Sequence, residues 1–173
     1  MTNASIVLTV VADDQPGIVE ALSDALATHH GNWTESSMMT LAGKFAGILL
    51  AEVPEERAAS FLNVLDSLEA GGMQIVAQRS EKPARPESAR ECSIELVGQD
   101  HPGIVHDITE VLARLGINVE ELETTVRSAS MSGESLFVAH ARILVPADVS
   151  TERLRHEMED LANELMVDID LEE

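Results

Sequence analysis

The sequence predicts an α+β fold built from two copies of one strand–helix–strand–strand–helix–strand unit. A repeated motif is the first observation, since Asp-Asp-Gln-Pro-Gly-Ile-Val at residues 13–19 returns as Gln-Asp-His-Pro-Gly-Ile-Val at residues 99–105. The same order of β-like and amphipathic helical segments surrounds each copy of the motif. Identical residues also stand in one register in both halves: Pro16 and Pro102, Gly17 and Gly103, Leu26 and Leu112, Ala27 and Ala113, and Asn32 and Asn118.

The first half begins with a strand and a helix. Residues 5–12 are rich in Val, Ile and Thr, which predicts a strand that is buried on both faces or nearly so. Apolar side chains at helical spacing predict an amphipathic helix over residues 17–28. Pro16 suits the first helical position, because its missing N–H would have no partner there. Gly31 is expected to form the left-handed cap that ends the helix.

A hairpin, a second helix and a fourth strand complete the first half. The two hairpin strands are expected at residues 32–41 and 45–53, with a tight turn between them at residues 42–44. Pro54 closes the hairpin, and an apolar stripe predicts a helix over residues 55–68. Gly71 and Gly72 break this helix before a last strand at residues 73–78.

A linker joins the two halves. Residues 80–89 contain two prolines, several charges and no large apolar side chain, which is typical of a linker. We therefore expect a first domain at residues 1–80, a linker at 81–89 and a second domain at 90–173. The second domain repeats the order with a longer hairpin turn around residues 128–133. Its elements are expected at residues 92–98, 103–115, 117–128, 135–145, 151–165 and 166–171.

This order of elements is the ferredoxin-like, split-βαβ arrangement. Two helices then cover one face of an antiparallel sheet, and the other face is left for something else to cover. A second unit could cover it by facing the sheet or by pairing along an edge strand.

The charge of the chain argues against direct contact with nucleic acid. It carries 11 basic and 31 acidic residues, so its net charge is 11 − 31 = −20. Binding to DNA or RNA needs clustered Lys and Arg, and single-strand binding usually adds stacking aromatics. The acidity suits a basic protein partner, or it serves solubility alone.

Cysteine use and hydropathy indicate a soluble cytoplasmic protein. The lone Cys92 lies on a predicted strand, where it is expected to pack as a small hydrophobe. No secretion signal opens the chain, and no apolar run is long enough to span a bilayer.

Neither a catalytic site nor a metal site is expected. The adjacent His29 and His30 would point apart on a helix, and the spacing of His101 and His106 is poor for ligands on one helix. His140 lies on an apolar strand and is interpreted as a hydrogen-bonded core or interface residue. No nucleophile elbow and no phosphate-binding motif occurs in the sequence. We therefore expect no cofactor and no enzymatic activity.

The Pro-Gly turn that precedes each first helix is the candidate ligand site. Unpaired amides and the positive dipole end of a helix attract a carboxylate, while an acidic side chain nearby can accept bonds from an ammonium group. A zwitterionic amino acid presents both groups. The residues predicted to bind it are Asp13, Asp14, Gln15, Gly17, Ile18 and Asn32 in the first copy, and Asp100, His101, Gly103, Ile104 and Asn118 in the second.

Two alternatives stay open at these turns. The aspartates could act only on the helix dipole, and the asparagines could only tolerate a left-handed turn. In the second copy, Gln99 replaces Asp13 and His101 replaces Gln15, so the two turns need not share a ligand. The acidic residues Glu120, Glu121 and Glu123 are interpreted as a solvated edge that could also face a basic partner.

The repeated Asp-x-Pro-Gly-Ile-Val motif, together with Asn at the start of the following strand, resembles the ACT-domain family. The resemblance covers nearly the whole chain as two copies. It implies binding of an amino acid or a related metabolite at domain interfaces, through the strand-to-helix loop and the strands beside it. Ligand binding would then shift the packing of that interface.

A pair of ACT domains with no catalytic domain is similar to the family of glycine cleavage system transcriptional repressors. That resemblance implies a protein that binds a DNA-binding activator and so represses transcription, with glycine as the effector. The alternative is an allosteric regulatory subunit of an amino-acid metabolic enzyme. Both functions need a protein partner and neither needs a membrane. A homodimer is compatible with both.

Overall fold

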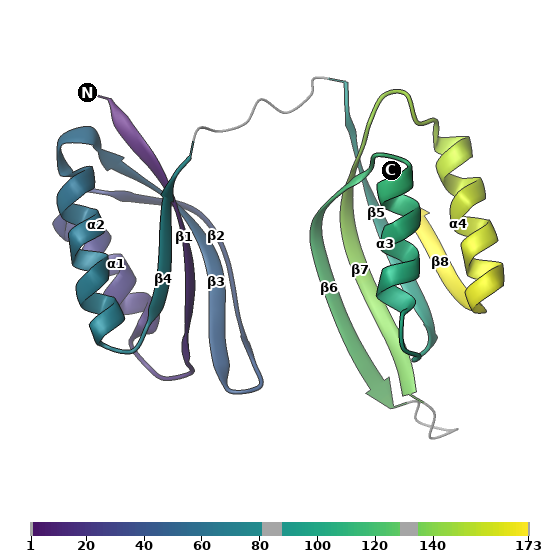
Figure 1. The fold of residues 1–173 in the computed structure, drawn as a ribbon, viewed down its shortest axis with the longest axis horizontal. Helices are drawn as coiled ribbons and strands as arrows, with labels where there is room; N and C mark the ends of the chain where they lie inside the picture. The colour runs from purple at the N-terminus through teal and green to yellow at the C-terminus, as the bar shows by residue number, and fades with distance from the viewer. Residues whose placement is uncertain (1, 81–87, 129–134, 173) are drawn as a thin grey trace. The chain divides into compact units, whose positions relative to one another are not determined.

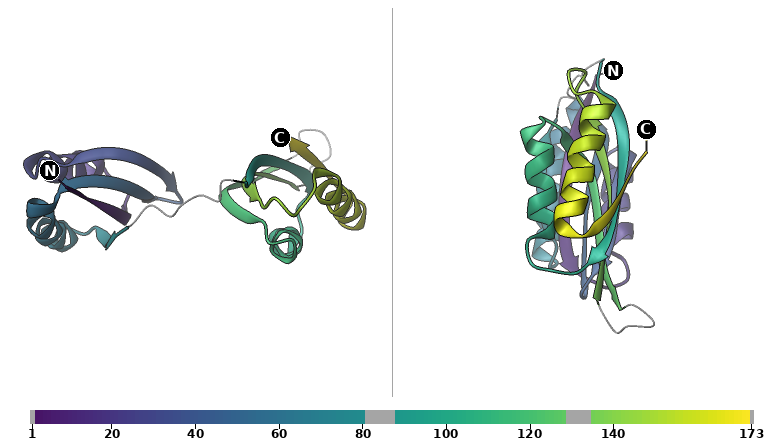
Figure 2. Two further views of the ribbon diagram at one scale, coloured as in Figure 1. Left: turned by 90° about the horizontal axis from the view of Figure 1, so that it is seen from above. Right: turned by 90° about the vertical axis from the view of Figure 1, so that its right-hand side faces the viewer.

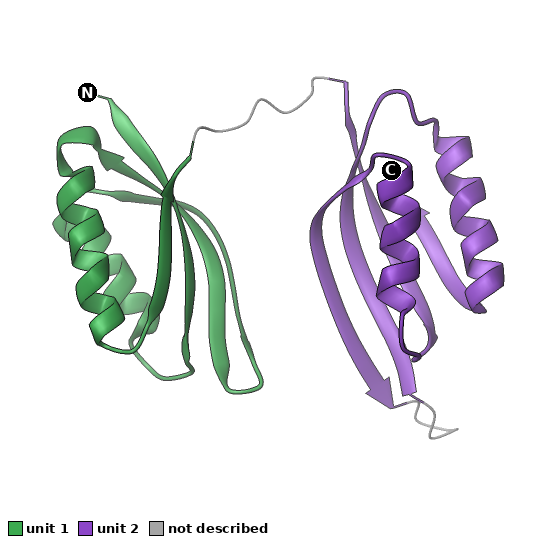
Figure 3. Cartoon of the chain, viewed as in Figure 1, with its two compact units in different colours: residues 1–83 green, residues 84–173 purple. Residues whose placement is uncertain are grey.

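The computed structural model describes residues 2–80, 88–128 and 135–172. It divides the chain into unit 1, Met1–Pro83, and unit 2, Ala84–Glu173 (Figure 3). The predicted linker at residues 81–89 lies mostly outside the described residues. The elements of unit 1 are β1 (Asn3–Asp13), α1 (Ile18–Thr28), β2 (Asn32–Leu41), β3 (Lys44–Pro54), α2 (Glu55–Ala70) and β4 (Gln74–Arg79).

Unit 2 repeats this order, so the predicted α+β fold with two ferredoxin-like units is confirmed. Its elements are β5 (Arg90–Gln99), α3 (Ile104–Arg114), β6 (Asn118–Ser128), β7 (Ser135–Val145), α4 (Thr151–Leu165) and β8 (Val167–Glu172). The longer hairpin turn predicted around residues 128–133 lies almost entirely outside the described residues.

Each unit is a four-stranded antiparallel sheet with two helices on one face. The strand orders are β2-β3-β1-β4 and β6-β7-β5-β8, with all pairs antiparallel. Within each unit both helices lie on the same side of the sheet, as the views in Figures 1 and 2 show. The opposite side of each sheet carries no helix and is called the open face below.

Each unit has its own aliphatic core between sheet and helices. In β1, Ile6, Leu8 and Val10 are buried in the core of unit 1. Alternate residues of a strand point to opposite faces, so Val7 and Thr9 lie on the open face, where Thr9 is exposed. The prediction that this strand is buried on both faces was therefore wrong, because helices cover only one face.

The helix that follows each motif begins two residues after its proline. Gly17 is the N-cap of α1 with φ 98°, and Gly103 is the N-cap of α3 with φ 96°. This left-handed conformation strains any residue with a Cβ, which is why glycine stands here. Pro16 lies before the cap rather than at the first helical position, so that prediction was wrong.

The end of α1 also differs from the prediction. His30, with φ 56°, holds the left-handed position that was expected for Gly31. The amide of His30 donates to Ala27 O over 3.0 Å, and the amide of Gly31 donates to Leu26 O over 2.8 Å. These two bonds form a Schellman cap. Gly31 is needed for space, because a Cβ there would lie 2.8 Å from Leu26 Cδ2.

The hairpin of unit 1 turns through two residues. Ala42 and Gly43 have φ of 49° and 79°, and the residues that flank them, Leu41 and Lys44, form the last strand pair. Positive φ at both central positions is the backbone of a type I′ turn. Lys44 therefore belongs to β3 and not to the turn.

Each core also contains a buried side chain that is not aliphatic. Cys92 is buried among the aliphatic residues of unit 2, as predicted. His29 is buried in unit 1, where its Nδ1 lies 2.7 Å from Ala25 O and its ring makes an edge-to-face contact with Phe61.

Candidate functional site

The predicted ligand turns lie at the same place in both units, beside the hairpin that follows. In unit 1 the amide of Asp14 donates to Gly43 O over 3.0 Å. In unit 2 the amide of Asp100 donates to Ser135 O over 2.9 Å. These bonds fix each strand-to-helix turn against the neighbouring hairpin strands.

The first amides of α1 and α3 have no side-chain cap. The first intrahelical bonds run from Ala21 N to Gly17 O over 2.9 Å and from Asp107 N to Gly103 O over 3.0 Å. The amides that precede these donors point out of the helix end, and a glycine at the N-cap offers no side chain to accept from them. At α4, by contrast, Ser150 Oγ accepts from the amide of Arg153 over 3.2 Å.

Acidic side chains stand close to both turns. Asp13, at the end of β1, forms an exposed ion pair with Lys44 and so already has a cationic partner. Glu20 lies in the first turn of α1, and Asp107 lies in the first turn of α3. A Cβ placed on Gly103 would lie only 3.9 Å from Asp107 Oδ2. A negative charge there favours the helix dipole but repels an anionic ligand.

Asp107 was missed by the sequence analysis, although a signal for it existed. It stands four residues after Gly103, one helical turn on, where side chains return to the same face. Ala21 holds the corresponding place in unit 1. The two turns therefore differ in charge as well as in the loop residues already noted.

The remaining turn residues play different structural parts. The side chains of Ile18 and Ile104 are buried in the cores, so only their backbones face the turn. Gln15 is exposed. His101 is half-buried, and its Nδ1 lies 3.2 Å from Pro102 O.

The asparagines lie at the far end of each unit from the turns. Asn32 is the first residue of β2 and pairs with Glu52, near the end of β3. The turn at Gly17 follows the opposite end of β1, where Asp13 pairs with Lys44. Asn118 has the corresponding place in unit 2, opposite Leu144. A single unit therefore does not bring its asparagine to its own helix amides.

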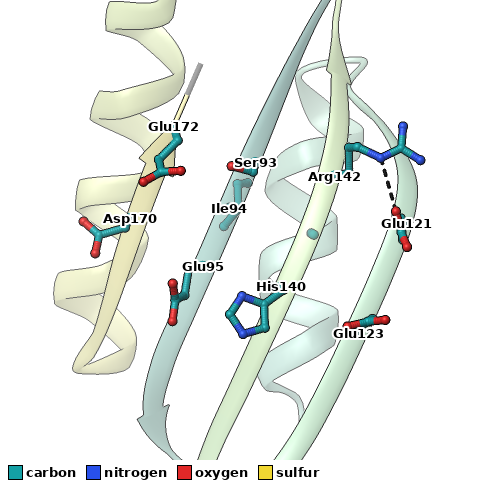
Figure 4. Close-up of a pocket in the computed structure, with 10 residues that line it drawn as sticks. Ser93, Ile94, Glu95, Glu121, Glu123, His140, Arg142, Asp170 and Glu172 are labelled. Atoms are coloured by element: carbon teal, nitrogen blue, oxygen red, sulfur yellow. Dashed lines mark hydrogen bonds and ion pairs between the residues drawn. The ribbon is translucent and has the colours of Figure 1, made fainter.

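A second candidate site is a hollow of about 380 Å3 on the open face of unit 2. Figure 4 shows its charged side chains standing on neighbouring strands. The charged and titratable residues that line it are Glu95, Glu121, Glu123, His140, Arg142, Asp170 and Glu172.

Arg142 is held at the edge of this hollow by three carboxylates. Its Nη1 lies 2.9 Å from Glu91 Oε1 and 2.6 Å from Glu120 Oε2, and its Nε lies 3.2 Å from Glu121 Oε2. The hydrogen bond to Glu91, followed by that to Glu121, raises the pKa of the Arg142 guanidinium above its ordinary value. Two consecutive glutamates reach the same arginine because a β-bulge interrupts β6 between Val119 and Glu121.

The other carboxylates of the hollow have no cationic partner among the residues that the structure describes. Glu95, Glu123 and Asp170 form no ion pair with another described residue. His140 stands between these carboxylates and is exposed, so of its two predicted roles the core position was wrong, and the interface position stays a prediction. On the open face of β7, His140 and Arg142 share the strand with the apolar Leu136, Val138 and Leu144, so apolar neighbours in the sequence do not mark a core position. The hollow is thus a negatively charged surface with one neutralised arginine at its edge.

The described residues contain no group of three or more His, Cys, Asp or Glu side chains placed to hold a metal ion. None of their helices has the length and apolar character needed to cross a membrane.

Comparison with protein families finds the same domain in both units. A family model for the ACT domain matches residues 4–78, and a second ACT-domain model matches residues 93–155. A UPF0237 protein of Methanosarcina acetivorans is 32% identical over 69 residues, which is 39% of this chain and 75% of that protein. A UPF0237 protein of Methanopyrus kandleri is 36% identical over 77 residues, or 44% and 79% of the two chains.

Two solved structures match almost the whole chain. An unknown protein from Galdieria sulphuraria is 33% identical with a TM-score of 0.87, covering 99% of this chain and 98% of its own. A candidate glycine cleavage system transcriptional repressor is 17% identical with a TM-score of 0.72, covering 99% and 97%. At that identity the second match shows a shared fold.

Proposed function

Because this chain belongs to the ACT-domain family, with two ACT domains in tandem, we propose that it is a regulatory protein whose effector is an amino acid. One observation carries the proposal. Both strand-to-helix turns have a left-handed glycine followed by helix amides without a side-chain cap. Such amides, at the positive end of a helix, suit a carboxylate.

The effector's carboxylate accepts from the amides that follow Gly17 or Gly103, and its ammonium group bonds to Asp14 or Asp100. Asp14 is the better partner in unit 1, because Asp13 is already paired with Lys44. Both first helical turns carry one acidic residue, Glu20 in α1 and Asp107 in α3, but only Asp107 approaches its N-cap: its Oδ2 lies 3.9 Å from a Cβ placed on Gly103, whereas nothing lies within 4 Å of one placed on Gly17. We therefore propose that unit 1 binds the effector more tightly than unit 2.

The regulated target is a protein rather than a nucleic acid. A chain with a charge of −20 repels phosphate backbones and attracts basic protein surfaces. The open face of unit 2 suits such a surface, because Glu95, Glu123 and Asp170 form no ion pair with another described residue. The name of the candidate repressor that shares the fold suggests the output. We propose repression of transcription through a DNA-binding activator, with glycine as the effector.

Titration calorimetry of the full chain with glycine and a panel of amino acids tests the ligand. We expect saturable binding, and we expect Gly17→Asp to weaken it at least about tenfold by adding bulk and negative charge at the carboxylate position. Gly103→Asp should have the smaller effect, and Asp107→Asn should strengthen binding at the second turn.

Gly72→Asp is the matched control. Gly72 has φ 101° and open space around its Cβ position, but it lies in the turn between α2 and β4. Gly72→Asp therefore introduces the same backbone strain and the same negative charge as Gly17→Asp, but at a position outside both proposed ligand sites. Absence of heat across the panel, or equal losses in Gly17→Asp and Gly72→Asp, would contradict the proposed site.

Capture of partners by the immobilised full chain, with and without glycine, tests the output. Recovery of a transcription factor supports repression, whereas recovery of a metabolic enzyme supports the alternative of an allosteric subunit. The double variant Glu95→Gln with Asp170→Asn should lose the partner. Glu110→Gln with Glu159→Gln, the same charge change on exposed helical positions of unit 2, should keep it.

A further inference from the structure

Each strand of unit 1 has a large apolar side chain on the open face. Met39 of β2 is 59% exposed, Ile48 of β3 is 50% exposed and Val76 of β4 is 58% exposed. On β1 the exposed Thr9 stands between Ile48 and Val76, and the half-buried Val7 and Val11 lie on either side of Thr9 along the strand. Every strand of the sheet thus has a large apolar side chain on this face, with the polar Ser37, Thr9 and Gln74 among them, and exposed apolar side chains in such number are typical of a contact surface.

Several of the same positions in unit 2 carry charged or titratable side chains. Thr9 of β1 and Glu95 of β5 are equivalent positions in the two units. Thr9 pairs with Ile48 and Val76, and Glu95 pairs with His140 and Asp170. Three of the apolar positions of unit 1 are charged or titratable in unit 2, whereas Val11 corresponds to the apolar Val97. Ile48 corresponds to His140, Leu50 to Arg142 and Val76 to Asp170. Two units with one fold have open faces of opposite character.

The charges on the open face of unit 1 lie toward its ends. Glu35 and Glu52 lie toward the end where β2 begins, and the ion pair of Asp13 with Lys44 lies at the other end. The row of Ile48 and Val76 and the row of Met39 and Val11 carry no charged side chain, whereas Glu35 shares a row with Leu50 and Val7. In a chain with a net charge of −20, the two uncharged rows form a surface where two copies can approach without bringing like charges together.

We infer that the open face of unit 1 is the interface through which two copies of this chain associate. A second copy offers the same exposed apolar side chains, the same strand twist and the same uncharged rows, so a two-fold axis through the face makes it self-complementary. The two sheets would pack face to face with aligned strands, about 10 Å apart. Their contact has a charge-depleted core and charges at its rim, as interfaces do.

Sedimentation equilibrium of the full chain over a wide concentration range tests this inference. The wild type should form a dimer. Val76→Asp should lower the association constant at least about a hundredfold, because each dimer would bury the new carboxylate twice. Val76→Thr removes apolar area while keeping the β-branched shape, and it should weaken association by a smaller factor with no loss of folding.

His140→Asp is the matched control, because it adds the same charge at the unit 2 position that corresponds to Ile48. It should leave the association constant unchanged. Circular dichroism confirms that each variant is folded. A wild type that stays monomeric would overturn the inference, whether the face is then covered within the chain or by a different protein. Equal losses in Val76→Thr and His140→Asp would overturn it as well.

Discussion

His30 is a non-glycine residue in a left-handed backbone conformation at the end of a helix. Its counterpart in unit 2 is Gly116, with φ 69°, whose amide makes the matching bond to Ala113 O over 3.0 Å. The left-handed conformation strains a side chain with a Cβ by roughly 1 to 2 kcal/mol. His30→Gly should therefore raise the free energy of unfolding of unit 1 by roughly 1 kcal/mol, as measured by urea unfolding.

The exchange in the other unit is the control for this prediction. Gly116→His should destabilise unit 2 by a similar amount, because the backbone bonds are the same and only the Cβ is added. If His30→Gly leaves the stability of unit 1 unchanged or lowers it, the exposed imidazole must contribute contacts that outweigh the strain.

At the level of single residues, the sequence located the turns but not their chemistry. Repetition singled out Gly17 and Gly103, yet it gave no φ, so the left-handed backbone was not foreseen. The pairing of Asp13 with Lys44 joins residues far apart in the chain, and no local pattern reports such contacts. Whether Asp14, Asn32 and their counterparts bind a ligand stays a prediction.

The strands and helices follow sequence periodicity closely, because each has a core face with apolar residues at the matching spacing. The irregular features do not. A β-bulge occurs at Trp33/Glu35 in β2 and at the corresponding Val119/Glu121 in β6. A bulge adds one residue opposite a single partner, and strand propensity carries no signal for that. Its repetition in both units shows that the duplication preserved backbone detail.

The pairing of β2 with β3 depends on one close approach. A Cβ on Gly47 would lie 2.3 Å from Met38 Cγ and 2.6 Å from Ser37 O. Gly47→Ala should therefore destabilise unit 1 by about 1 to 3 kcal/mol, since the strands must separate to admit the methyl group. Thermal unfolding followed by circular dichroism measures the loss.

At the equivalent place in unit 2, a larger residue on one strand faces a smaller residue on the other. Ala139 stands where unit 1 has Gly47, and Thr124 faces it where unit 1 has Met38. Combining Gly47→Ala with Met38→Thr should recover part of the lost stability. No recovery would mean that the backbone contact with Ser37, and not the methionine side chain, sets the spacing of these strands.

For the whole molecule, the sequence predicted the repeat and the fold of each copy, but not that the open faces would differ. Val7 and Val11 made β1 look buried on both sides, because an apolar residue on an open face has the same pattern as one in a core. In β5 the alternation of Glu91, Ser93 and Glu95 with core residues marks the solvated face plainly. Topology, rather than composition, decides which face of a strand the helices cover.

Ionic strength should act with opposite signs on the two open faces. Salt screens the mutual repulsion of two chains that each carry a charge of −20, so dimer formation through unit 1 should strengthen as sodium chloride is raised. Binding of a basic partner to unit 2 should weaken under the same change. Sedimentation equilibrium measures how the dimer association constant changes with salt concentration, and surface capture measures the same dependence for the affinity of the basic partner. Slopes of the same sign would contradict this division of roles.

Trp33 is the only tryptophan of the chain, and tyrosine is absent. It lies in β2, packs against the core of unit 1, and donates from Nε1 to Ser36 Oγ over 3.1 Å. Indole fluorescence therefore reports on unit 1 alone, whereas the far-ultraviolet signal of the backbone reports on both units. The native chain thus contains an intrinsic probe that separates the unfolding of its two similar domains without labelling.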